Sequence, residues 1–438
     1  MSIPHIGAEP VVYRGVRISG GDARDLVVDG GVITALDGEA PGGARIVDAD
    51  GLIALPGLVD LHTHLREPGF EASETILTGS RAAAAGGYTT VFAMPNTSPV
   101  ADTAGVVEQE LALGEAAGYV HVQPIGAVTV GQRGERLAEL GAMASSRARV
   151  RVFSDDGFCV WDPLIMRRAL EYVKSFGGVI AQHAQDPRLT EGAQMNEGTV
   201  SAELGLAGWP AVAEESIIAR DVLLAEHVGS RLHVCHLSTA GSVEIIRWAK
   251  ARGVAVTAEV TPHHLLLTEE LVRGYDPRFK VNPPLRRDDD VRAVREGLAD
   301  GTIDIVATDH APHPAEAKSC EWQAAAHGMV GLESALRVVQ QTMVDTGMLD
   351  WADVARVMSA VPARIGRLTP PALEVGAPAA FVLYDPRPAR TFTRDDLHGR
   401  SVNSPYLGRD LPGEVRWTVN GGFVTVADGE LVDREGVA

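Results

Sequence analysis

Two patterns of apolar and polar positions alternate along the middle of the chain. Short apolar stretches of strand type are each followed by a longer stretch in which apolar residues recur at helical spacing. The first such pair is GLVDLHTHL at 57–65 and ETILTGSRAAAAGG at 74–87. Further strand candidates lie at 87–96, 120–130, 149–157, 178–185, 231–239, 254–264 and 303–312. This alternation predicts an α/β fold, either a (β/α)8 TIM-type barrel or a doubly wound open sheet.

Almost every strand candidate ends in polar residues that could take part in chemistry. These residues are His62 and His64, Asn96, Asp155 and Asp156, His183, His236, His263 and His264, and Asp309 and His310. Barrel enzymes build their sites from the carboxyl ends of several strands around the ring. An open sheet would instead concentrate such residues at one switch point. The distribution therefore favours the barrel.

The two ends of the chain have a different texture, with short strands separated by Gly and Asp turns. The DGG turn at 29–31 stands between alternating apolar positions and indicates a hairpin. A similar texture returns at 379–386 and 414–432. We therefore expect one small β-sandwich domain built from residues 1–56 and 369–438. It would flank a catalytic barrel of residues 57–368.

Composition and charge narrow the class of protein. The chain has 438 residues, and its 45% apolar and 22% charged fractions are ordinary for a globular protein. The formal net charge of −19, without any cluster of Lys and Arg, argues against a nucleic-acid partner. No apolar run approaches the ~20 residues needed to cross a bilayer. We therefore expect a cytoplasmic protein that binds neither nucleic acid nor membrane.

Histidines and aspartates at the strand ends predict a metal centre. His62 and His64 are two positions apart in a strand, so both point to the same face and could form half of a metal site. His183, His236 and Asp309 each end a later strand. Together these ligands exceed what one tetrahedral zinc ion needs, and they predict two neighbouring metal ions.

Two neighbouring metal ions need a bridging anion, either a carboxylate or a carbamylated lysine. The chain has four lysines, and Lys174, the only one between the second and third of these histidines, lies in a helical pattern. The fourth strand contains no lysine, so the bridge should be Asp155 or Asp156. Only one of the two can point inward, because successive strand residues face opposite sides.

Several short motifs occur in a fixed order over nearly the whole chain. They are HTHLREPG, MPNT, FSDDG, AQH, HLS, VTPHHLLL, VNPPLR and ATDHAPH. In combination they resemble the motifs of type I dihydroorotases in the amidohydrolase superfamily, and within it the subgroup whose metals are bridged by an aspartate. The family's bridging aspartate lies 27 residues before the histidine of the fifth strand, which selects Asp156, with Asp155 as the alternative.

The resemblance implies an activity and its cofactor. It implies a cyclic amide hydrolase with two zinc ions per subunit that reversibly cyclises N-carbamoyl-L-aspartate to (S)-dihydroorotate in de novo pyrimidine (UMP) biosynthesis. In the hydrolytic direction, a metal-bridging hydroxide would attack the ring amide. Asp309, as a metal ligand and general acid/base, would pass the proton of the attacking water to the leaving ring nitrogen. Because ring opening releases a proton, acid should favour ring closure, by about tenfold per pH unit.

The resemblance also implies a set of substrate contacts. These are Arg66, Asn96, Asn282, His313, His327 and Gly328. Arg66 lies two residues beyond His64 on the same face, and its guanidinium would bind the free carboxylate of the substrate. Asn96 and His313 resemble further carboxylate contacts, and the other three positions resemble contacts to the ring amides. The residue type at position 327 departs from the family's usual one.

One segment near the predicted site has no assigned role. HAPHPAEAKSCEW, at 310–322, follows the eighth strand and is too polar and too rich in proline to form part of the core. It starts at the carboxyl end of a barrel strand, where substrates bind, and it could close over one.

Two other classes of function compete with this interpretation. A hydantoinase or allantoinase would use the same metals, but a substrate without a carboxylate has little use for Arg66. A non-catalytic barrel that stabilises a carbamoyltransferase is expected to have lost metal ligands, whereas all six positions here carry competent ones. Besides its small-molecule substrate, the enzyme is compatible with a homodimer or with a complex with aspartate carbamoyltransferase.

Overall fold

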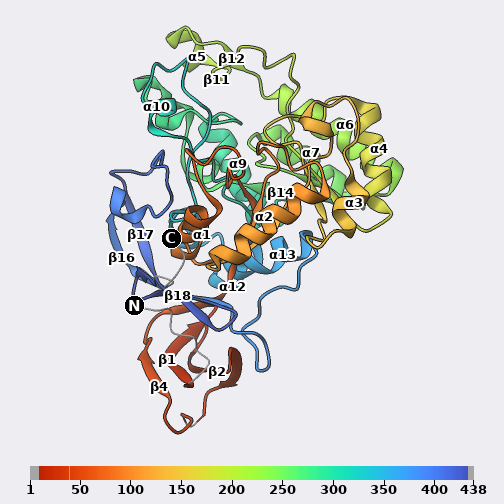
Figure 1. Cartoon of the computed structure of the whole chain (residues 1–438). Helices are drawn as coiled ribbons and strands as arrows, with labels where there is room; N and C mark the ends of the chain where they lie inside the picture. Colours follow the sequence, from red (N-terminus) through yellow and green to blue (C-terminus); the bar gives the residue numbers. More distant parts are fainter. Residues whose placement is uncertain (1–8, 39, 433–438) are drawn as a thin grey trace.

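The computed structural model describes residues 9–38 and 40–432, and its centre is a ring of eight parallel strands (Figure 1). In order around the ring they are β6 (Leu58–Thr63), β7 (Tyr88–Ala93), β8 (His121–Pro124), β9 (Val152–Phe153), β10 (Val179–Gln182), β13 (Leu232–Val234), β14 (Val256–Val260) and β15 (Ile305–Val306). Parallel bridges from Gly126 to Phe153 and from Thr63 to His310 close the two gaps in the ring. The (β/α)8 barrel predicted from the sequence is confirmed, and the open sheet is excluded.

Helices cover the outside of the barrel. The longer ones are α1 (Ile76–Ala85), α2 (Ala104–Ala117), α3 (Leu140–Ser145), α4 (Pro163–Lys174), α6 (Val212–Val228), α7 (Ala240–Ala251) and α9 (Asp288–Ala299). Helix α4 shows why they form: Asp162 caps the first turn, Pro163 fits position N1, and buried residues recur at helical spacing from Met166 to Val173.

Shorter helical pieces complete the set. They are α5 (Thr199–Leu204), α8 (Pro262–Leu266), α10 (Ala315–Lys318), α11 (Ala335–Val339), α12 (Trp351–Ala355) and α13 (Val361–Ile365). The 3-10 turns are η1 (Val130–Gln132), η2 (Glu269–Gly274), η3 (Pro277–Phe279) and η6 (Arg394–Asp396), and the π-helical turns are η4 (Gln340–Val344) and η5 (Arg356–Ala360). Among all helices of the described residues, none combines the length and the apolar character that a membrane crossing requires.

Strands from both ends of the chain form one nine-stranded sheet beside the barrel (Figure 1). The N-terminal strands are β1 (Val11–Ile18), β2 (Ala23–Asp29), β3 (Val32–Leu36), β4 (Arg45–Asp48) and β5 (Ile53–Pro56), and the C-terminal strands are β16 (Phe381–Thr391), β17 (Asp410–Asn420), β18 (Phe423–Ala427) and β19 (Glu430–Leu431). Antiparallel pairing of β5 with β16 joins the two halves. The hairpin at the DGG turn is present, and both Gly30 and Gly31 adopt the positive φ that a tight turn of this kind requires.

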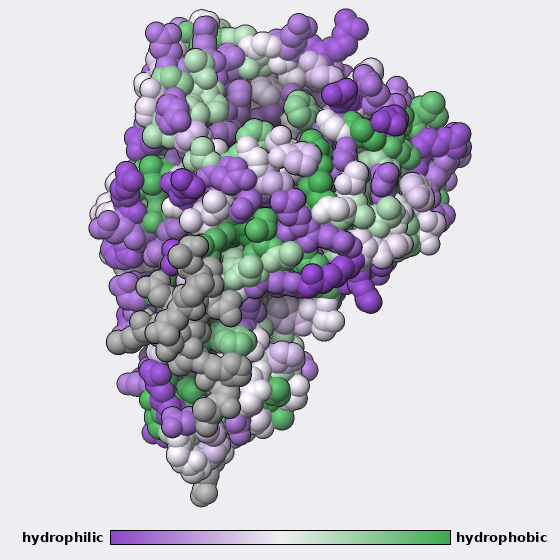
Figure 2. Space-filling model, viewed as in Figure 1, coloured by the Kyte–Doolittle hydropathy of each residue, from purple (hydrophilic) through white to green (hydrophobic). Residues whose placement is uncertain are grey.

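The sheet has a hydrophobic core of its own, and it also contacts the barrel. Tyr13 meets Phe381 and Trp417 edge to face, at ring-centroid distances of 5.2 and 5.7 Å. Towards the barrel, the Thr418 hydroxyl donates to the carbonyl of Ala84 at the end of α1. Polar side chains predominate on the face of the molecule in Figure 2, with scattered apolar residues between them.

Two long excursions rise beyond the barrel strands and pack together near α5 and α10 (Figure 1). One carries the short strands β11 (Met195–Asn196) and β12 (Gly208–Trp209), and the other carries α10. Met195, Val200 and Trp322 form a small buried cluster between them. The expectation that 310–322 stays outside the core is therefore wrong, because Lys318 and Trp322 are only 7% and 5% exposed.

Candidate active site

The carboxyl ends of the barrel strands bring the six predicted metal ligands together. Those residues are His62, His64, Asp156, His183, His236 and Asp309, and none is more than 4% exposed. The first lies within β6, and the others follow β6, β9, β10, β13 and β15 directly or within a few residues. Residues separated by as many as 247 positions in the sequence thus share one buried site, because the ring places every strand end at the same opening.

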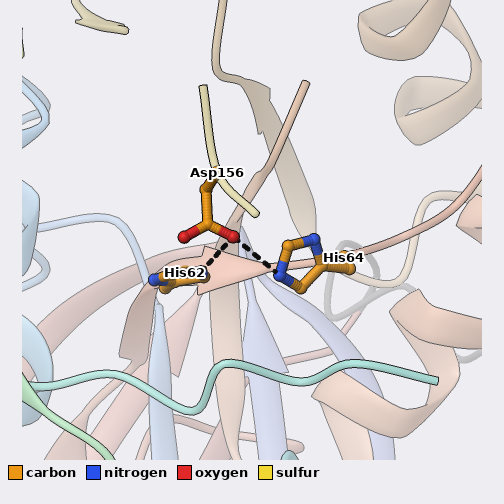
Figure 3. A group of neighbouring side chains, drawn as sticks. All are labelled: His62, His64 and Asp156. Carbon is orange, nitrogen blue, oxygen red and sulfur yellow. Dashed lines mark ion pairs between the residues drawn. The ribbon is translucent and has the colours of Figure 1, made fainter. Parts of the chain in front are cut away.

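The carboxylate of Asp156 stands between two pairs of histidines. Its Oδ2 lies 3.4 Å from Nε2 of His62 and 3.3 Å from Nε2 of His64 (Figure 3). Its Oδ1 lies 3.0 Å from Nδ1 of His183 and 3.1 Å from Nε2 of His236. Each oxygen therefore faces its own imidazole pair. This is the arrangement expected of a carboxylate that bridges two metal ions.

Asp309 joins the first of these pairs. Its Oδ1 lies 3.1 Å from Nε2 of His64 and 3.5 Å from Nε2 of His62. The backbone of Asp309 has a φ of +47°, and that of His236 a φ of +31°, both in a region that non-glycine residues rarely adopt. Such strain is often concentrated at functional sites, where it fixes the direction of a side chain.

Asp155 points away from the histidines. Its Oδ1 accepts hydrogen bonds from the amides of Val128 and Thr129, at 2.8 and 3.0 Å, and its Oδ2 accepts one from the Thr129 hydroxyl. Burial raises the pKa of Asp155 to about 6, although these hydrogen bonds oppose the rise. Of the two candidates for the bridge, Asp156 lies in the cluster, whereas Asp155 ties the loop after β8 to the end of β9.

Glu259, on β14, contacts two histidines of the cluster on the side away from Asp156. This residue was not identified from the sequence. Its Oε1 lies 2.6 Å from Nδ1 of His62 and accepts from the amide of His236 at 3.1 Å, and its Oε2 lies 3.0 Å from Nε2 of His233. The contact leaves Nε2 of His62 facing Asp156, buried and without a hydrogen-bond partner among the described residues. An acidic residue in the otherwise uncharged strand VTAEV was the available signal.

The charges of the cluster suit a cation. Burial opposes a charge on His62, but Asp156 and Glu259 outweigh it and raise the pKa of His62 well above its usual value. For Asp156, burial is likewise outweighed by His62 and His183, which hold its pKa well below the usual range. Buried imidazoles with a common carboxylate and an unpartnered nitrogen are the donor set of a divalent metal, which would replace the protons.

Asn96 lies beside a predicted ligand as well as near the expected substrate pocket. Its Oδ1 is 2.9 Å from Nδ1 of His64, so the amide orients this ring with Nε2 towards the carboxylates. The family resemblance predicts a contact between Asn96 and the substrate. The structure gives its oxygen a different partner, and only its NH2 group remains for a ligand.

Arg66 comes from the loop after β6, because the strand ends at Thr63, two residues before the predicted end at residue 65. Its backbone has a φ of +66°, and its Nε donates to the carbonyl of Pro312 at 3.2 Å. Within the described part of the chain its two terminal nitrogens have no hydrogen-bond partner. Burial lowers the pKa of Arg66 to about 10, although Asp309 and Asp156 oppose the shift, so the side chain stays charged.

The residues expected to bind the ring amides surround the same opening. The Asn282 amide group donates to Oε1 of Gln185 at 3.0 Å and lies 3.4 Å from Nε2 of His183. Its own Oδ1 is buried and has no partner among the described residues. Gln185 also lies 2.7 Å from that histidine nitrogen, and sequence reasoning did not identify it.

The segment at His327 and Gly328 is held tightly by its neighbours. The Gly328 amide donates to the carbonyl of Lys280 at 3.0 Å, and the Gly328 carbonyl accepts from Nζ of Lys318 at 2.9 Å. Nε2 of His313 donates to the carbonyl of His327 at 2.7 Å, so in this tautomer its Nδ1 is an acceptor. The backbone amide of Gly328 is therefore not free for a ring amide.

A barrel whose strand ends gather histidines around a shared aspartate defines a class, the metal-dependent amidohydrolases. Family models agree: one described as Dihydro-orotase-like matches residues 51–242, and one described as Amidohydrolase family matches residues 210–423. A dihydroorotase of Leifsonia xyli subsp. xyli is 72% identical over 98% of this chain and 99% of its own length. A dihydroorotase of Mycobacterium tuberculosis is 54% identical over 96% and 99%. The chain belongs to the dihydroorotase family, as its motifs predicted.

Solved structures confirm the fold. An L-hydantoinase (dihydropyrimidinase) from Arthrobacter aurescens superposes with a TM-score of 0.87 over 98% of both chains, at 24% sequence identity. A dihydropyrimidinase from Brevibacillus agri has a TM-score of 0.84 over 98% of this chain and 97% of its own, at 20% identity. These similarities support the barrel with its accompanying sheet, and they leave the substrate to be argued from the site.

Proposed function

We propose that this enzyme catalyses the reversible cyclisation of N-carbamoyl-L-aspartate to (S)-dihydroorotate in pyrimidine biosynthesis. The observation that carries the proposal is the Arg66 guanidinium, which lies beside a cluster of metal-ligand type and whose terminal nitrogens have no hydrogen-bond partner among the described residues. A guanidinium in this position suits a cyclic amide that also carries a carboxylate. The high identity to proteins named dihydroorotase supports the same substrate.

We propose two zinc ions as the cofactor. One would be held by His62, His64, Asp156 and Asp309, and the other by Asp156, His183 and His236. Histidine and carboxylate ligands suit zinc, although such sites also accept cobalt or manganese. When bound, the ions would polarise the ring carbonyl and supply an activated water.

Within the proposed mechanism, Asp309 carries the proton. Burial favours its neutral form, but His62 and His64 outweigh burial and lower the pKa of Asp309. The Asp309 carboxylate is therefore ionised at neutral pH, and one of its oxygen atoms can accept the proton of the attacking water. In the hydrolytic direction it would deliver that proton to the ring nitrogen as the amide bond breaks, and in ring closure it would take the proton back.

The other side chains bind and orient. Arg66 would hold the substrate carboxylate through its two terminal nitrogens, and the NH2 group of Asn96 would add a second donor. The buried, unpartnered Oδ1 of Asn282 would accept from a ring N–H group.

Hydrolysis of a hydantoin is the second candidate, because hydantoinases share the fold. Turnover of dihydroorotate and hydantoin by metal-loaded wild type and Arg66→Ala distinguishes the two. We expect wild type to consume dihydroorotate, and Arg66→Ala to raise its KM about 10- to 100-fold through loss of charged hydrogen bonds. Arg231→Ala is the matched control, since Arg231 precedes β13 at the opposite end of the barrel. Turnover of hydantoin that is insensitive to Arg66→Ala would refute the proposal.

The proposed cellular location and binding partners are those expected for this substrate. A cytoplasmic location fits an enzyme of nucleotide synthesis, and the acidic charge gives no reason to propose a nucleic-acid partner. A homodimer and a complex with aspartate carbamoyltransferase both stay predictions from the family resemblance.

A further inference from the structure

Lys318, at the end of α10, is a buried cation outside the metal cluster. It is 7% exposed, and its Nζ donates to the carbonyls of Lys280, Ala326 and Gly328 at 3.0, 2.8 and 2.9 Å. An ammonium has three donors and no acceptor, so these three carbonyls use its whole hydrogen-bonding capacity. Among the described residues, the carboxylate that acts on its charge is that of Asp276.

The three carbonyls belong to two segments that carry predicted substrate contacts. Lys280 begins the segment that leads to Asn282, while Ala326 and Gly328 flank His327. The two segments also touch directly, through the hydrogen bond from the Gly328 amide to the Lys280 carbonyl. Lys318 therefore fastens together two parts of the chain that approach the substrate pocket from different loops.

Burying an ammonium costs free energy, and here hydrogen bonds to three backbone carbonyls offset that cost. Lys280 adds a second buried cation, which donates to Oε1 of Gln194 and to the carbonyls of Trp322 and Gln323. Two of the chain's four lysines are thus buried side by side in a protein with 58 acidic residues.

The charge of Lys318 affects the pKa values of two histidines at the pocket. Burial lowers the pKa of His313 to about 3, and the charges of Arg66 and Lys318 add to this shift, while the hydrogen bond to the His327 carbonyl opposes it. His327 feels both Lys280 and Lys318, and its pKa is lowered to about 4, again mainly by burial. The neighbouring histidines are therefore neutral near pH 7, and below that pH Lys318 adds a positive charge to this wall.

We propose that Lys318 is a positioning residue for substrate binding: its ammonium clamps the 280–282 and 326–328 segments into one wall of the pocket and favours an anionic ligand there. This inference rests on the proposed dihydroorotase function. Lys318 does not touch the reacting atoms, so its loss should weaken binding and leave the chemical step intact.

Lys318→Met in the full-length, metal-loaded enzyme tests the inference, because methionine matches the length of the lysine side chain up to Cε and removes the ammonium. We expect KM for dihydroorotate to rise about tenfold, with kcat within about twofold of wild type and an unchanged metal content. Lys250→Met is the matched control, since Lys250 also donates to a carbonyl, that of Gly301, but at the end of α7. Its KM should equal that of wild type.

A rescue experiment separates a missing ammonium from a damaged fold. Added propylammonium should lower the raised KM of Lys318→Ala, because it can occupy the space of the removed side chain. An unchanged KM in Lys318→Met, an equal loss in kcat, or failure of the rescue would overturn the inference. Wild type that does not turn over dihydroorotate would instead refute the proposed function.

The pH dependence of KM in wild type gives a test that needs no folded variant. Burial and the neighbouring Lys280 lower the pKa of Lys318 to about 7, while Asp276 and Cys320 oppose the shift. The ammonium is present below that pH and lost above it, so KM should rise between about pH 6 and pH 8. A KM that stays flat or falls over this interval would overturn the inference.

Discussion

Glu259 shows at the scale of single residues how the site depends on groups beyond the metal ligands. Its carboxylate accepts from Nδ1 of His62, so the other ring nitrogen must be the one that faces the shared aspartate. It also holds the backbone amide of His236, a ligand of the second pair. One buried carboxylate thus orients ligands on both sides of Asp156.

We therefore predict that Glu259→Gln lowers metal affinity about 10- to 100-fold while the protein stays folded. The glutamine side chain lacks the negative charge of Glu259. Its NH2 group is a donor and would face the donor at Nε2 of His233. Competition with a chelator, followed by metal analysis, measures the effect. Glu110→Gln is the control, because Glu110 is equally buried but lies on α2, where it contacts the Thr97 hydroxyl and no histidine of the cluster. Equal metal retention in both variants would contradict this role of Glu259.

At the scale of elements, the motifs HLS and VNPPLR prove to be joined through Arg286. This side chain is 1% exposed and donates to Oγ of Ser238, Oδ1 of Asn196 and the carbonyl of Trp209. Its remaining nitrogen lies 3.5 Å from Oε2 of Glu214 on α6. The network connects the loops after β10, β13 and β14, which carry the site.

Removing the arginine should therefore destabilise the fold. Arg286→Leu leaves Glu214 as an unpaired buried charge, and we expect a loss of about 3–5 kcal/mol in the free energy of unfolding. Urea unfolding measures this quantity. Arg287→Leu is the matched control, because Arg287 is exposed and its ion pair with Asp290 should contribute less than about 1 kcal/mol. Equal stability of the two variants would show that the network does not support the loops.

The sequence predicted the elements that depend on local patterns and missed those that depend on distant contacts. All eight barrel strands were found, because each is a short apolar run that the structure buries. The excursions at 186–211 and 312–328 could not be predicted, since their small core joins residues such as Met195 and Trp322 without any period. The burial of Lys318 could not be predicted for the same reason, because it depends on contacts with residues far away in the sequence.

At the scale of the whole molecule, the ring topology decides which predicted residues meet. Residue type and strand position predicted five of the six proposed ligands, because strand ends of a barrel converge, and the family resemblance selected Asp156 over Asp155. The contacts that support these residues were not predicted, since Glu259 and Asn96 reach the histidines through side-chain directions that no spacing rule gives. We further propose that the barrel comprises residues 57–368 and that residues 1–56 and 369–438 form the second domain, joined by the pairing of β5 with β16.

The central claim, that Asp156 joins two metal sites, is tested most directly by the number of metal ions bound per chain. Metal analysis after saturation and removal of free ions should give two per chain for wild type and for Asp155→Asn, because Asp155 faces the loop after β8. Asp156→Asn should retain fewer than one, since both histidine pairs lose their shared carboxylate. A single ion in wild type, or two ions retained by Asp156→Asn, would contradict the account.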